Sequence, residues 1–538
     1  MDPINHNENP WRPLHWVQQV ARHASQSPDG AALSYGTRVV TWAELDDRTR
    51  RLATALADRG VERGSRVLLA ATNRPEFIET LVAVHRLGAV LVPVNFRLAP
   101  AEIDHIAADS GAVAVVTDTV VRPAIEQTRL RASGIPVLVI GDEGQQGGDE
   151  GPERYEHAIA SCEPDERIGP DDLAELAFVM YTSGTTGRPK GAMLTYQNLI
   201  TQTITTMGVL RLVEPDEVAA ITSPLFHIAS IGHVIPSLML GHSMVLVETG
   251  RFEPGTFLDL LAAHSVTSAF LVPSVWHRVC EEQGQNPRDL SLRSLAWGAE
   301  PARAATLELM AATFPEASIC SSFGQTEMSP ITLVVTGAES RAKLGSVGRP
   351  VSLVEVRVVN DDMADVAVGE VGEIVYRGPG TTIGYWNAPE ATADAFRGGW
   401  FHSGDLVRVD EDGYFYVVDR LKDMIISGGE NIYSAEVEQA IVAHPDVADV
   451  AVVGAPHPRW GETPVAFVVP KDRSAPPDPD DVIAFCAARL AGYKKPSEVL
   501  VVDELPRNAS GKVLKPTLRG LVTTRPDASP SENEKVNR

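Results

Sequence analysis

The sequence lacks the features that would assign it to a membrane protein or to a disulfide-bonded secreted protein. No apolar run approaches the roughly 20 residues needed to span a bilayer, and the polar stretch 1–13 has no signal-peptide core. Its four cysteines, Cys162, Cys280, Cys320 and Cys486, are scattered without metal-type pairing. We therefore expect a cytoplasmic protein with reduced, mostly buried thiols.

Positive charge is also scarce. The chain has 47 Lys and Arg against 71 Asp and Glu, which gives a formal net charge of -24 at pH 7. Such a protein would repel the phosphate backbone of a nucleic acid, so a general nucleic-acid role is excluded. Any anionic substrate must instead meet locally placed cations.

The length and the early pattern indicate a multidomain α/β protein. At 538 residues the chain exceeds what one core usually supports. Segments 42–59 and 76–87 are predicted as helices, and segments 67–70 and 89–94 as buried strands, an alternation typical of a doubly wound layer. Segment 141–172 is rich in Gly, Glu, Asp and Pro and predicts a solvated connection.

A polar loop follows the short apolar run 177–180, which predicts a buried strand. Residues 181–190 read Tyr-Thr-Ser-Gly-Thr-Thr-Gly-Arg-Pro-Lys. Its glycines let backbone N–H groups turn inward, its hydroxyls add donors, and its lysine adds a charge, which together suit a polyphosphate. The common mononucleotide signature differs, because it ends in Gly-Lys-Ser/Thr. The residues that we expect to contact phosphate are Thr182, Ser183, Gly184, Thr185, Thr186, Gly187 and Lys190.

This string resembles the phosphate-binding loop of the acyl-activating, adenylate-forming superfamily, which includes acyl-CoA ligases, peptide-synthetase adenylation domains and firefly-type luciferases. The resemblance extends over about residues 16–519, and segments 323–330 and 400–438 look most like bacterial, especially actinobacterial, fatty-acyl-CoA ligases. It implies a large N-terminal domain of helix-flanked sheets, 1–421, and a small mobile α+β domain, 422–523. The polar tail 524–538 is predicted to be disordered.

The resemblance assigns a nucleotide site. Residues 321–327 correspond to the family's Tyr-Gly-x-Thr-Glu signature, with Phe323 at the tyrosine position, where an aromatic face can still stack on adenine. Glu327 would bind the Mg²⁺ that accompanies ATP, with Thr182 as a helper. Asp405 would accept hydrogen bonds from the ribose hydroxyls, although a turn aspartate is the alternative, and Arg420 would contact the ribose. The other residues assigned to ATP or AMP are Gly298, Ala299, Glu300, Ser322, Gly324, Gln325 and Thr326.

The resemblance also assigns an acyl pocket. Its expected residues are His227, Ile231, Gly232, His233, Trp297 and Gly298. His227 has the alternative of an ordinary hydrogen-bonded core histidine. Trp297 departs from the glycine that relatives commonly have, and it could equally pack behind its strand. Amino-acid-activating relatives place an Asp near segment 223–233 and this segment has none, which favours a substrate without an ammonium group. We expect a fatty or other hydrophobic acid, and an aromatic or polycyclic acid stays open.

Further motifs suggest a second reaction step with coenzyme A. The resemblance makes Lys422 a hinge and Lys512 the catalytic lysine. Gly428 and Gly429 suit close passage of the pantetheine arm, although a plain β-turn is the alternative. The other residues assigned to coenzyme A are Glu430, Trp460, Lys494 and Lys495. Segment 345–373 has no room for the insertion seen in ligases that load carrier proteins.

The sequence therefore predicts an ATP-dependent acyl-CoA ligase that forms an acyl-AMP and passes the acyl group to the CoA thiol, with AMP and pyrophosphate released. Lys512, Thr182 and Glu327 are the predicted catalytic residues. Three alternatives stay open: an enzyme that loads a carrier protein, an enzyme specialised in thioester formation from acyl-AMP in a secondary-metabolite pathway, and a silent nucleotide-binding protein. The presence of Lys512 argues against the last. The oligomeric state is open, a homodimer included.

Overall fold

The computed structural model describes residues 14–141, 154–182, 189–507 and 512–523. They divide into two compact units. The first comprises Met1–Arg357, Val375–His402 and Glu411–Tyr416, and the second comprises Val358–Ile374, Ser403–Asp410 and Val417–Arg538. The second unit thus includes residues that precede Lys422. The domain boundary expected at Lys422 stays a prediction. The expected tail 524–538 lies outside the described residues.

Two large sheets organise the first unit. One has the order β6-β5-β3-β4-β7-β8, and the other has the order β15-β14-β13-β12-β11-β9-β10-β1-β2. The strands of the six-stranded sheet are β3 Arg66–Ala70, β4 Val90–Pro93, β5 Ala114–Asp118, β6 Val137–Ile140, β7 Leu176–Thr182 and β8 Lys190–Thr195. The strands of the nine-stranded sheet are β1 Ala31–Tyr35, β2 Arg38–Thr41, β9 Val218–Ile221, β10 Ser243–Leu246, β11 Ser268–Leu271, β12 Ser294–Gly298, β13 Ser318–Gly324, β14 Ile331–Val334 and β15 Arg349–Pro350.

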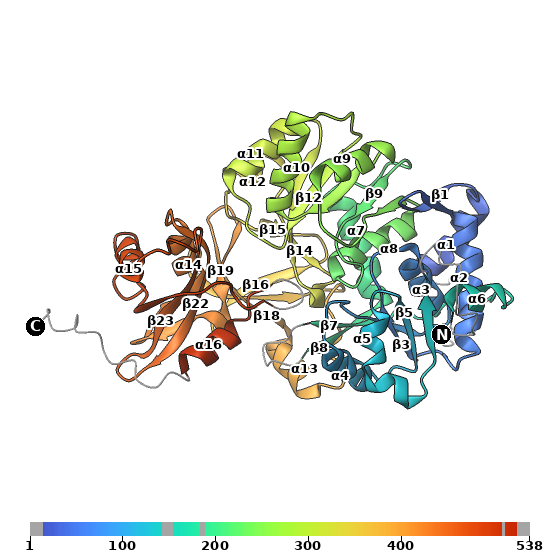
Figure 1. Ribbon diagram of the computed structural model, residues 1–538, viewed down its shortest axis with the longest axis horizontal. Helices are drawn as coiled ribbons and strands as arrows, with labels where there is room; N and C mark the ends of the chain where they lie inside the picture. Colours follow the sequence, from blue (N-terminus) through green and yellow to red (C-terminus); the bar gives the residue numbers. More distant parts are fainter. Residues whose placement is uncertain (1–13, 142–153, 183–188, 508–511, 524–538) are drawn as a thin grey trace, which may run out of the picture. The chain divides into compact units, whose positions relative to one another are not determined.

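Most neighbouring strands of both sheets run parallel, so helices must carry the chain back between them. The helices of the first unit are α1 Trp16–Gln26, α2 Trp42–Ala57, α3 Pro75–Arg86, α4 Pro100–Ser110, α5 Arg122–Glu126, α6 Tyr155–Ala160, α7 Tyr196–Leu210, α8 Ile228–Leu240, α9 Pro254–Ala263, α10 Pro273–Gln285, α11 Ala304–Thr313, α12 Gly337–Ala342 and α13 Pro389–Ala395. Figure 1 shows α9, α10 and α11 in green beside β12. The predicted α/β fold class is confirmed.

The period-2 alternation of the strands builds the layers. Leu69 packs into a central core with α1, α2, α3 and α8, whereas its neighbour Leu68 packs with α4 and α5. In the other sheet, Ile221 faces the same central core and Ala220 faces α9, α10 and α11. Both sheets are therefore covered by helices on both faces, as parallel strands require.

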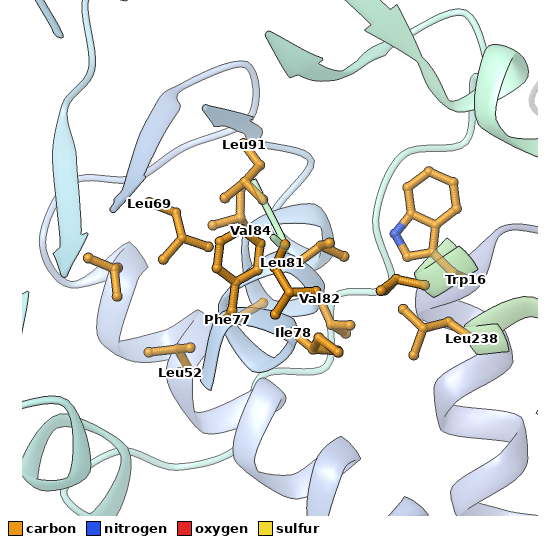
Figure 2. Packing of buried hydrophobic residues seen from close by; sticks show 14 of the residues in the cluster. Trp16, Leu52, Leu69, Phe77, Ile78, Leu81, Val82, Val84, Leu91 and Leu238 are labelled. Atoms are coloured by element: carbon orange, nitrogen blue, oxygen red, sulfur yellow. The ribbon is translucent and has the colours of Figure 1, made fainter. Parts of the chain in front are cut away.

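Helix α3 is the centre of this core, since all twelve of its residues are buried. Figure 2 shows Phe77, Leu81 and Val84 beside Leu69 and Leu91 of the six-stranded sheet. The side chains of Ile78 and Val82 lie toward Trp16 and Leu238, from α1 and α8. The helix thus packs on two sides, and its buried carboxylates Glu76 and Glu79 are paired with arginines within the fold.

The stretch 141–172 is not only the solvated connection that its composition predicts. Within its described part, α6 packs against α2, and the ring of Tyr155 is fully buried. The Tyr155 hydroxyl donates to Glu79 Oε2 at 3.0 Å. The expectation was wrong for α6, because a helix of only six residues shows too little periodicity to detect.

The second unit contains a smaller α+β arrangement. Its sheet has the order β21-β20-β23-β22, with β24 beside β23. The elements are β20 Ile425–Ser427, β21 Glu430–Ile432, β22 Val447–His457, β23 Gly461–Pro470, β24 Glu498–Val501, α14 Ser434–Val442, α15 Pro479–Ala487 and α16 Lys515–Thr523. A further four-stranded sheet, whose residues are shared between the two units, has the order β16-β17-β18-β19: Glu355–Val359, Val371–Arg377, Phe401–Val409 and Phe415–Arg420. No helix in the described part of the chain could cross a membrane.

A buried histidine ties α1, α3 and β7 together. Nδ1 of His85 accepts a hydrogen bond from Trp16 Nε1 at 2.9 Å, and its Nε2 lies 2.9 Å from the carbonyl of Ala177. Burial lowers the pKa of His85 to about 3. The neutral ring can satisfy both contacts, one as acceptor and one as donor, whereas the protonated ring could not accept from Trp16.

We predict that His85 makes the first unit acid-labile. Between pH 6.5 and about 3 the unfolded chain binds a proton at His85 that the folded chain does not, so stability falls as pH falls. His85→Gln should lower the free energy of unfolding at pH 7 but reduce its loss on acidification, by up to about 1.4 kcal/mol per pH unit. Urea titrations at pH 7 and pH 5.5 measure this, and an unchanged pH slope in the variant would contradict it.

Candidate active site

Strands β7 and β8 fix the two ends of the predicted phosphate loop. Thr182 and Lys190 are register partners in this antiparallel pair. Behind them, a Cβ at Gly191 would lie only 2.5 Å from Val179 Cγ1, so only glycine allows the strands this approach. The predicted phosphate contacts Ser183, Gly184, Thr185, Thr186 and Gly187 lie outside the described residues.

A tyrosine connects Lys190 with Glu327. The hydroxyl of Tyr385 donates to Glu327 Oε1 at 2.9 Å, and its ring lies 5.4 Å from Lys190 Nζ. Burial and the neighbouring Glu327 carboxylate raise the pKa of Tyr385. The hydroxyl therefore remains protonated and keeps donating to the carboxylate.

The residues around Glu327 suit a magnesium ion that arrives with its nucleotide. Glu327 is 8% exposed and lies in the short helix η3, Thr326–Met328. Among the described residues no group of three or more His, Cys, Asp or Glu could hold a metal by itself. Mg²⁺ is usually bound through one or two carboxylates together with substrate phosphates, so one carboxylate fits this mode. Thr182 as a second ligand stays a prediction.

The predicted adenine segments meet at one edge of the nine-stranded sheet. Strands β12 and β13 run parallel, and Gly298 pairs with Ser322 at their carboxyl ends, which is where ligands bind in open α/β sheets. A Cβ at Gly298 would lie 2.4 Å from the Ser322 carbonyl oxygen. Ala299 has a left-handed φ of 67°, and Glu300 Oε1 accepts from the backbone N–H of Ser274. Glu300 is thus engaged with the start of α10.

Two of the residues assigned to the acyl pocket, His233 and Gly298, lie beside one aromatic ring. The ring of Phe270, on β11, lies 6.0 Å from the ring of His233, and a Cβ at Gly298 would lie 3.2 Å from Phe270 Cε2. Gly232 lies close to Pro330, whose Cδ would be 3.1 Å from an added Cβ. Burial lowers the pKa of His233 to about 4, so the imidazole is neutral near pH 7.

The other expected pocket residues lie elsewhere. Ile231 is fully buried in the central core. Trp297 packs with α10 and α11, on the face of β12 opposite Ala296, in agreement with the alternative that it packs behind its strand. His227 is exposed at the start of α8, where its Nδ1 accepts from Ala229 N at 3.1 Å. Sequence spacing along a helix or strand did not reveal which side chain faces which side.

In the second unit, Asp405 is buried against a cation. Its Oδ1 lies 2.9 Å from Arg420 Nε. Burial raises the pKa of Asp405, while the positive charges of Arg420 and Lys512 oppose that rise. The structure therefore brings together the two predicted ribose residues, and the positive charge of Lys512 acts on the carboxyl group of Asp405.

The predicted coenzyme A residues fall into two groups. Gly428 and Gly429 form the β20–β21 turn with φ of 60° and 89°, and a Cβ at Gly428 would lie 2.9 Å from Trp460 Cε3. Trp460 is 40% exposed, and Glu430 opens β21 directly after the turn. Lys494 is separate from them: its ammonium contacts both carboxylate oxygens of Glu436 at 2.8 Å. Lys495 is exposed.

The structure adds Tyr385 and Phe270, to which the sequence reading gave no role. Tyr385 follows Gly384 in a segment that pairs with β8, as the backbone hydrogen bond from Met193 N to Gly384 O shows. Phe270 sits on a strand whose sequence reads as ordinary core. Only the tertiary pairing of distant segments identifies either residue.

Comparison with known proteins shows the family to which the chain belongs. Residues 20–386 match the AMP-binding enzyme family, and residues 436–512 match the AMP-binding enzyme C-terminal domain. The chain is 42% identical over 502 residues to a feruloyl-CoA synthase of an Amycolatopsis species, covering 93% of this chain and 97% of that protein. It is 34% identical over 481 residues to a long-chain-fatty-acid–CoA ligase of Mycobacterium tuberculosis, covering 89% and 92%.

A solved structure is similar over nearly the whole chain. The o-succinylbenzoate CoA synthetase of Bacillus subtilis, in complex with its acyl-adenylate intermediate, superimposes with a TM-score of 0.83 at 31% identity. The match covers 95% of this chain and 98% of that one.

We predict that Tyr385→Phe weakens the binding of ATP with magnesium. Loss of the hydroxyl removes one hydrogen bond that orients Glu327, and a hydrogen bond to a charged group is worth about 1.5–3 kcal/mol, so the Kd should rise about tenfold or more. Calorimetric titration with ATP at several Mg²⁺ concentrations measures this. Tyr35→Phe, on β1, is the control, and an equal shift in both variants would contradict the assignment.

Proposed function

The chain belongs to the AMP-binding enzyme family and is an ATP-dependent acid–thiol ligase that acts through an acyl-AMP, and we propose that its acid is an aromatic carboxylic acid. Its substrates are therefore ATP, with Mg²⁺, and coenzyme A beside the acid. Because the substrates are ATP and coenzyme A, we also propose a cytoplasmic location.

The observation that carries the choice of acid is the contact of Phe270 with Gly298 and His233. A phenyl ring and a neutral imidazole offer flat, weakly polar faces, and aromatic pairs gain about 0.5–1.5 kcal/mol beyond their area burial. The relative with 42% identity is named for feruloyl-CoA, an aromatic thioester. A fatty acid is the second candidate, because the relative from M. tuberculosis is named for long-chain fatty acids.

In the proposed first half-reaction the acid's carboxylate attacks the α-phosphorus of ATP, and pyrophosphate leaves. Magnesium neutralises charge on the phosphates. Lys190 would contact the departing pyrophosphate, with its direction set by the ring of Tyr385. Lys512 would lie between carboxylate and α-phosphate, where a fixed ammonium lowers the repulsion between two anions. Asp405, paired with Arg420, would hold the ribose.

In the proposed second half-reaction the CoA thiol attacks the carbonyl of acyl-AMP, and AMP leaves. Lys512 cannot occupy the approach that the thiol needs, so we infer a rotation about Lys422 that withdraws it. The left-handed turn at Gly428 and Gly429, with the exposed Trp460 against it, would then meet the pantetheine arm. The carrier-protein alternative requires the same turn to meet a protein-bound pantetheine.

We predict that Phe270→Ala discriminates between the two acid classes. The variant should lose about tenfold in kcat/KM for ferulate, equivalent to about 1.4 kcal/mol, and much less for a long-chain fatty acid. Initial rates of thioester formation with both acids measure this. Phe252→Ala, whose ring packs with Phe257 away from this site, is the control. A wild-type enzyme that prefers the fatty acid would overturn the proposed aromatic substrate.

We predict that Lys512→Ala separates the half-reactions. Removal of one charged contact to the transition state should slow adenylation about 100-fold or more, while thioester formation from supplied acyl-AMP survives. Pyrophosphate exchange and direct thioester assays measure the two steps. Equal loss of both steps would refute the assigned division of labour.

A further inference from the structure

Helix α16 contacts the segment around the predicted hinge through two cations one turn apart. Arg519 Nη2 donates to the carbonyl of Lys422 at 2.9 Å and to Asp423 Oδ1 at 2.8 Å. Four residues earlier, Lys515 points from the first position of the helix to the same side, since residues i and i+4 share a helical face. The two cations therefore fix the start of α16 against residues 419–423.

Lys515 reaches that segment through a buried hydroxyl. Its ammonium donates to Ser434 Oγ at 2.7 Å, and the Ser434 hydroxyl donates in turn to Asp419 Oδ2 at 2.9 Å. Ser434 is fully buried and Asp419 is 6% exposed. The backbone N–H of Ala435, at the start of α14, also donates to Asp419 Oδ2 at 3.4 Å. These contacts form a continuous chain from Lys515 to Asp419.

Lys515 also compensates a second carboxylate. Its ammonium lies 2.8 Å from Glu438 Oε1, which accepts from the backbone N–H of Val452 as well. The side chain of Lys515 is only 14% exposed. Burial raises the pKa of Glu438, and the positive charge of Lys515 opposes this rise. Removal of the ammonium would take from Glu438 the cation that compensates its buried charge and would end the chain of contacts to Asp419 at Ser434.

The same lysine stands at the base of the segment that bears Lys512. Val513 bridges to Arg507, and Leu514 N donates to the carbonyl of Pro506 at 2.7 Å. Lys512 therefore leaves the body of the unit directly from this closed base, three residues before Lys515. A shift at Lys515 would move Lys512 with it.

We propose that Lys515 is a positioning residue, which sets Lys512 for adenylation by tying the base of its segment, through Ser434, to Asp419. The inference rests on the proposed roles of Lys512 and Lys422. Asp419 precedes the predicted hinge, whereas Ser434 and Lys515 follow it. A rotation about Lys422 must therefore part the contact between Ser434 and Asp419, so the chain of contacts favours the adenylating arrangement and is released for the thioester step.

The space beside Lys515 allows a substitution that keeps the positive charge. A cavity of about 250 Å³ adjoins Lys515 and is lined also by Lys422, Glu438 and Val513. Arginine keeps the charge and has room to enter this cavity, whereas methionine keeps the length of the side chain without the charge. Ser434→Ala removes the relay to Asp419 but leaves the ion pair of Lys515 with Glu438. Lys471→Met is the matched control, because among the described residues the Lys471 ammonium contacts only the exposed backbone carbonyl of Pro445.

The test compares the two half-reactions in these full-length variants, with thermal unfolding recorded beside them. Lys515→Met and Ser434→Ala should lower the kcat of adenylation about tenfold to 100-fold, with unchanged KM for ATP and acid, because Lys512 is displaced by a small distance. Thioester formation from supplied acyl-AMP should be retained or faster. Lys515→Arg should restore most of the adenylation rate, and Lys471→Met should behave as wild type.

Three outcomes would overturn the inference. Loss of both half-reactions in parallel with a fall in Tm would make Lys515 merely structural. Normal adenylation by Lys515→Met and Ser434→Ala, beside an inactive Lys512→Ala, would overturn this inference alone. Normal adenylation by Lys512→Ala would instead overturn the proposed role of Lys512, and the positioning role with it.

Discussion

Repulsion between two anions is the constraint on which this enzyme depends. The acid's carboxylate must reach a triphosphate inside a protein with a formal net charge of -24. Cations in each unit have partners that direct them. In the first unit Lys190 lies over the ring of Tyr385, and in the second unit Arg420 pairs with the buried Asp405 and Lys515 contacts Glu438 and Ser434. An acidic surface with directed internal cations can hold phosphate locally without binding polyanions in general.

The two large sheets of the first unit position the residues of the candidate site. Parallel β11, β12 and β13 bring Phe270, Gly298 and Ser322 to one edge, although about fifty residues separate the first from the last. Antiparallel β7 and β8 place Thr182 opposite Lys190. Helix α3 packs in the central core beside both sheets, and its buried charges are paired within the fold, as Glu79 is with Arg48.

Much of this could be predicted from the sequence. The alternation of apolar segments predicted the α/β class, and the order of motifs along the chain, including those with Glu327 and Asp405, predicted the family that the comparisons confirm. The direction of individual side chains was not predictable. Ile231 and His233 are two residues apart, yet one faces the core and the other faces Phe270, because a helix turns about 200° over two residues. The bond from Tyr385 to Glu327 joins segments 58 residues apart and has no local signature.

The hinge shows a different limit. Residues 417–421 belong to the second compact unit, and the Ser434 hydroxyl donates a hydrogen bond to Asp419. The family resemblance instead places the hinge after these residues, at Lys422. Both can hold if the contact at Asp419 exists in one arrangement of the reaction cycle and breaks in the other. A sequence motif indicates the position of a hinge, but only the structure shows which contacts oppose rotation about it.

The proposed order of events is that the acid's own oxygen attacks phosphorus before the thiol arrives. The most direct measurement uses an aromatic acid labelled with ¹⁸O in both carboxylate oxygens, with ATP, magnesium and coenzyme A, followed by mass spectrometry of the products. We expect one ¹⁸O atom in AMP, one in the thioester carbonyl, and none in pyrophosphate. Label in inorganic phosphate, or a thioester formed without labelled AMP, would contradict it.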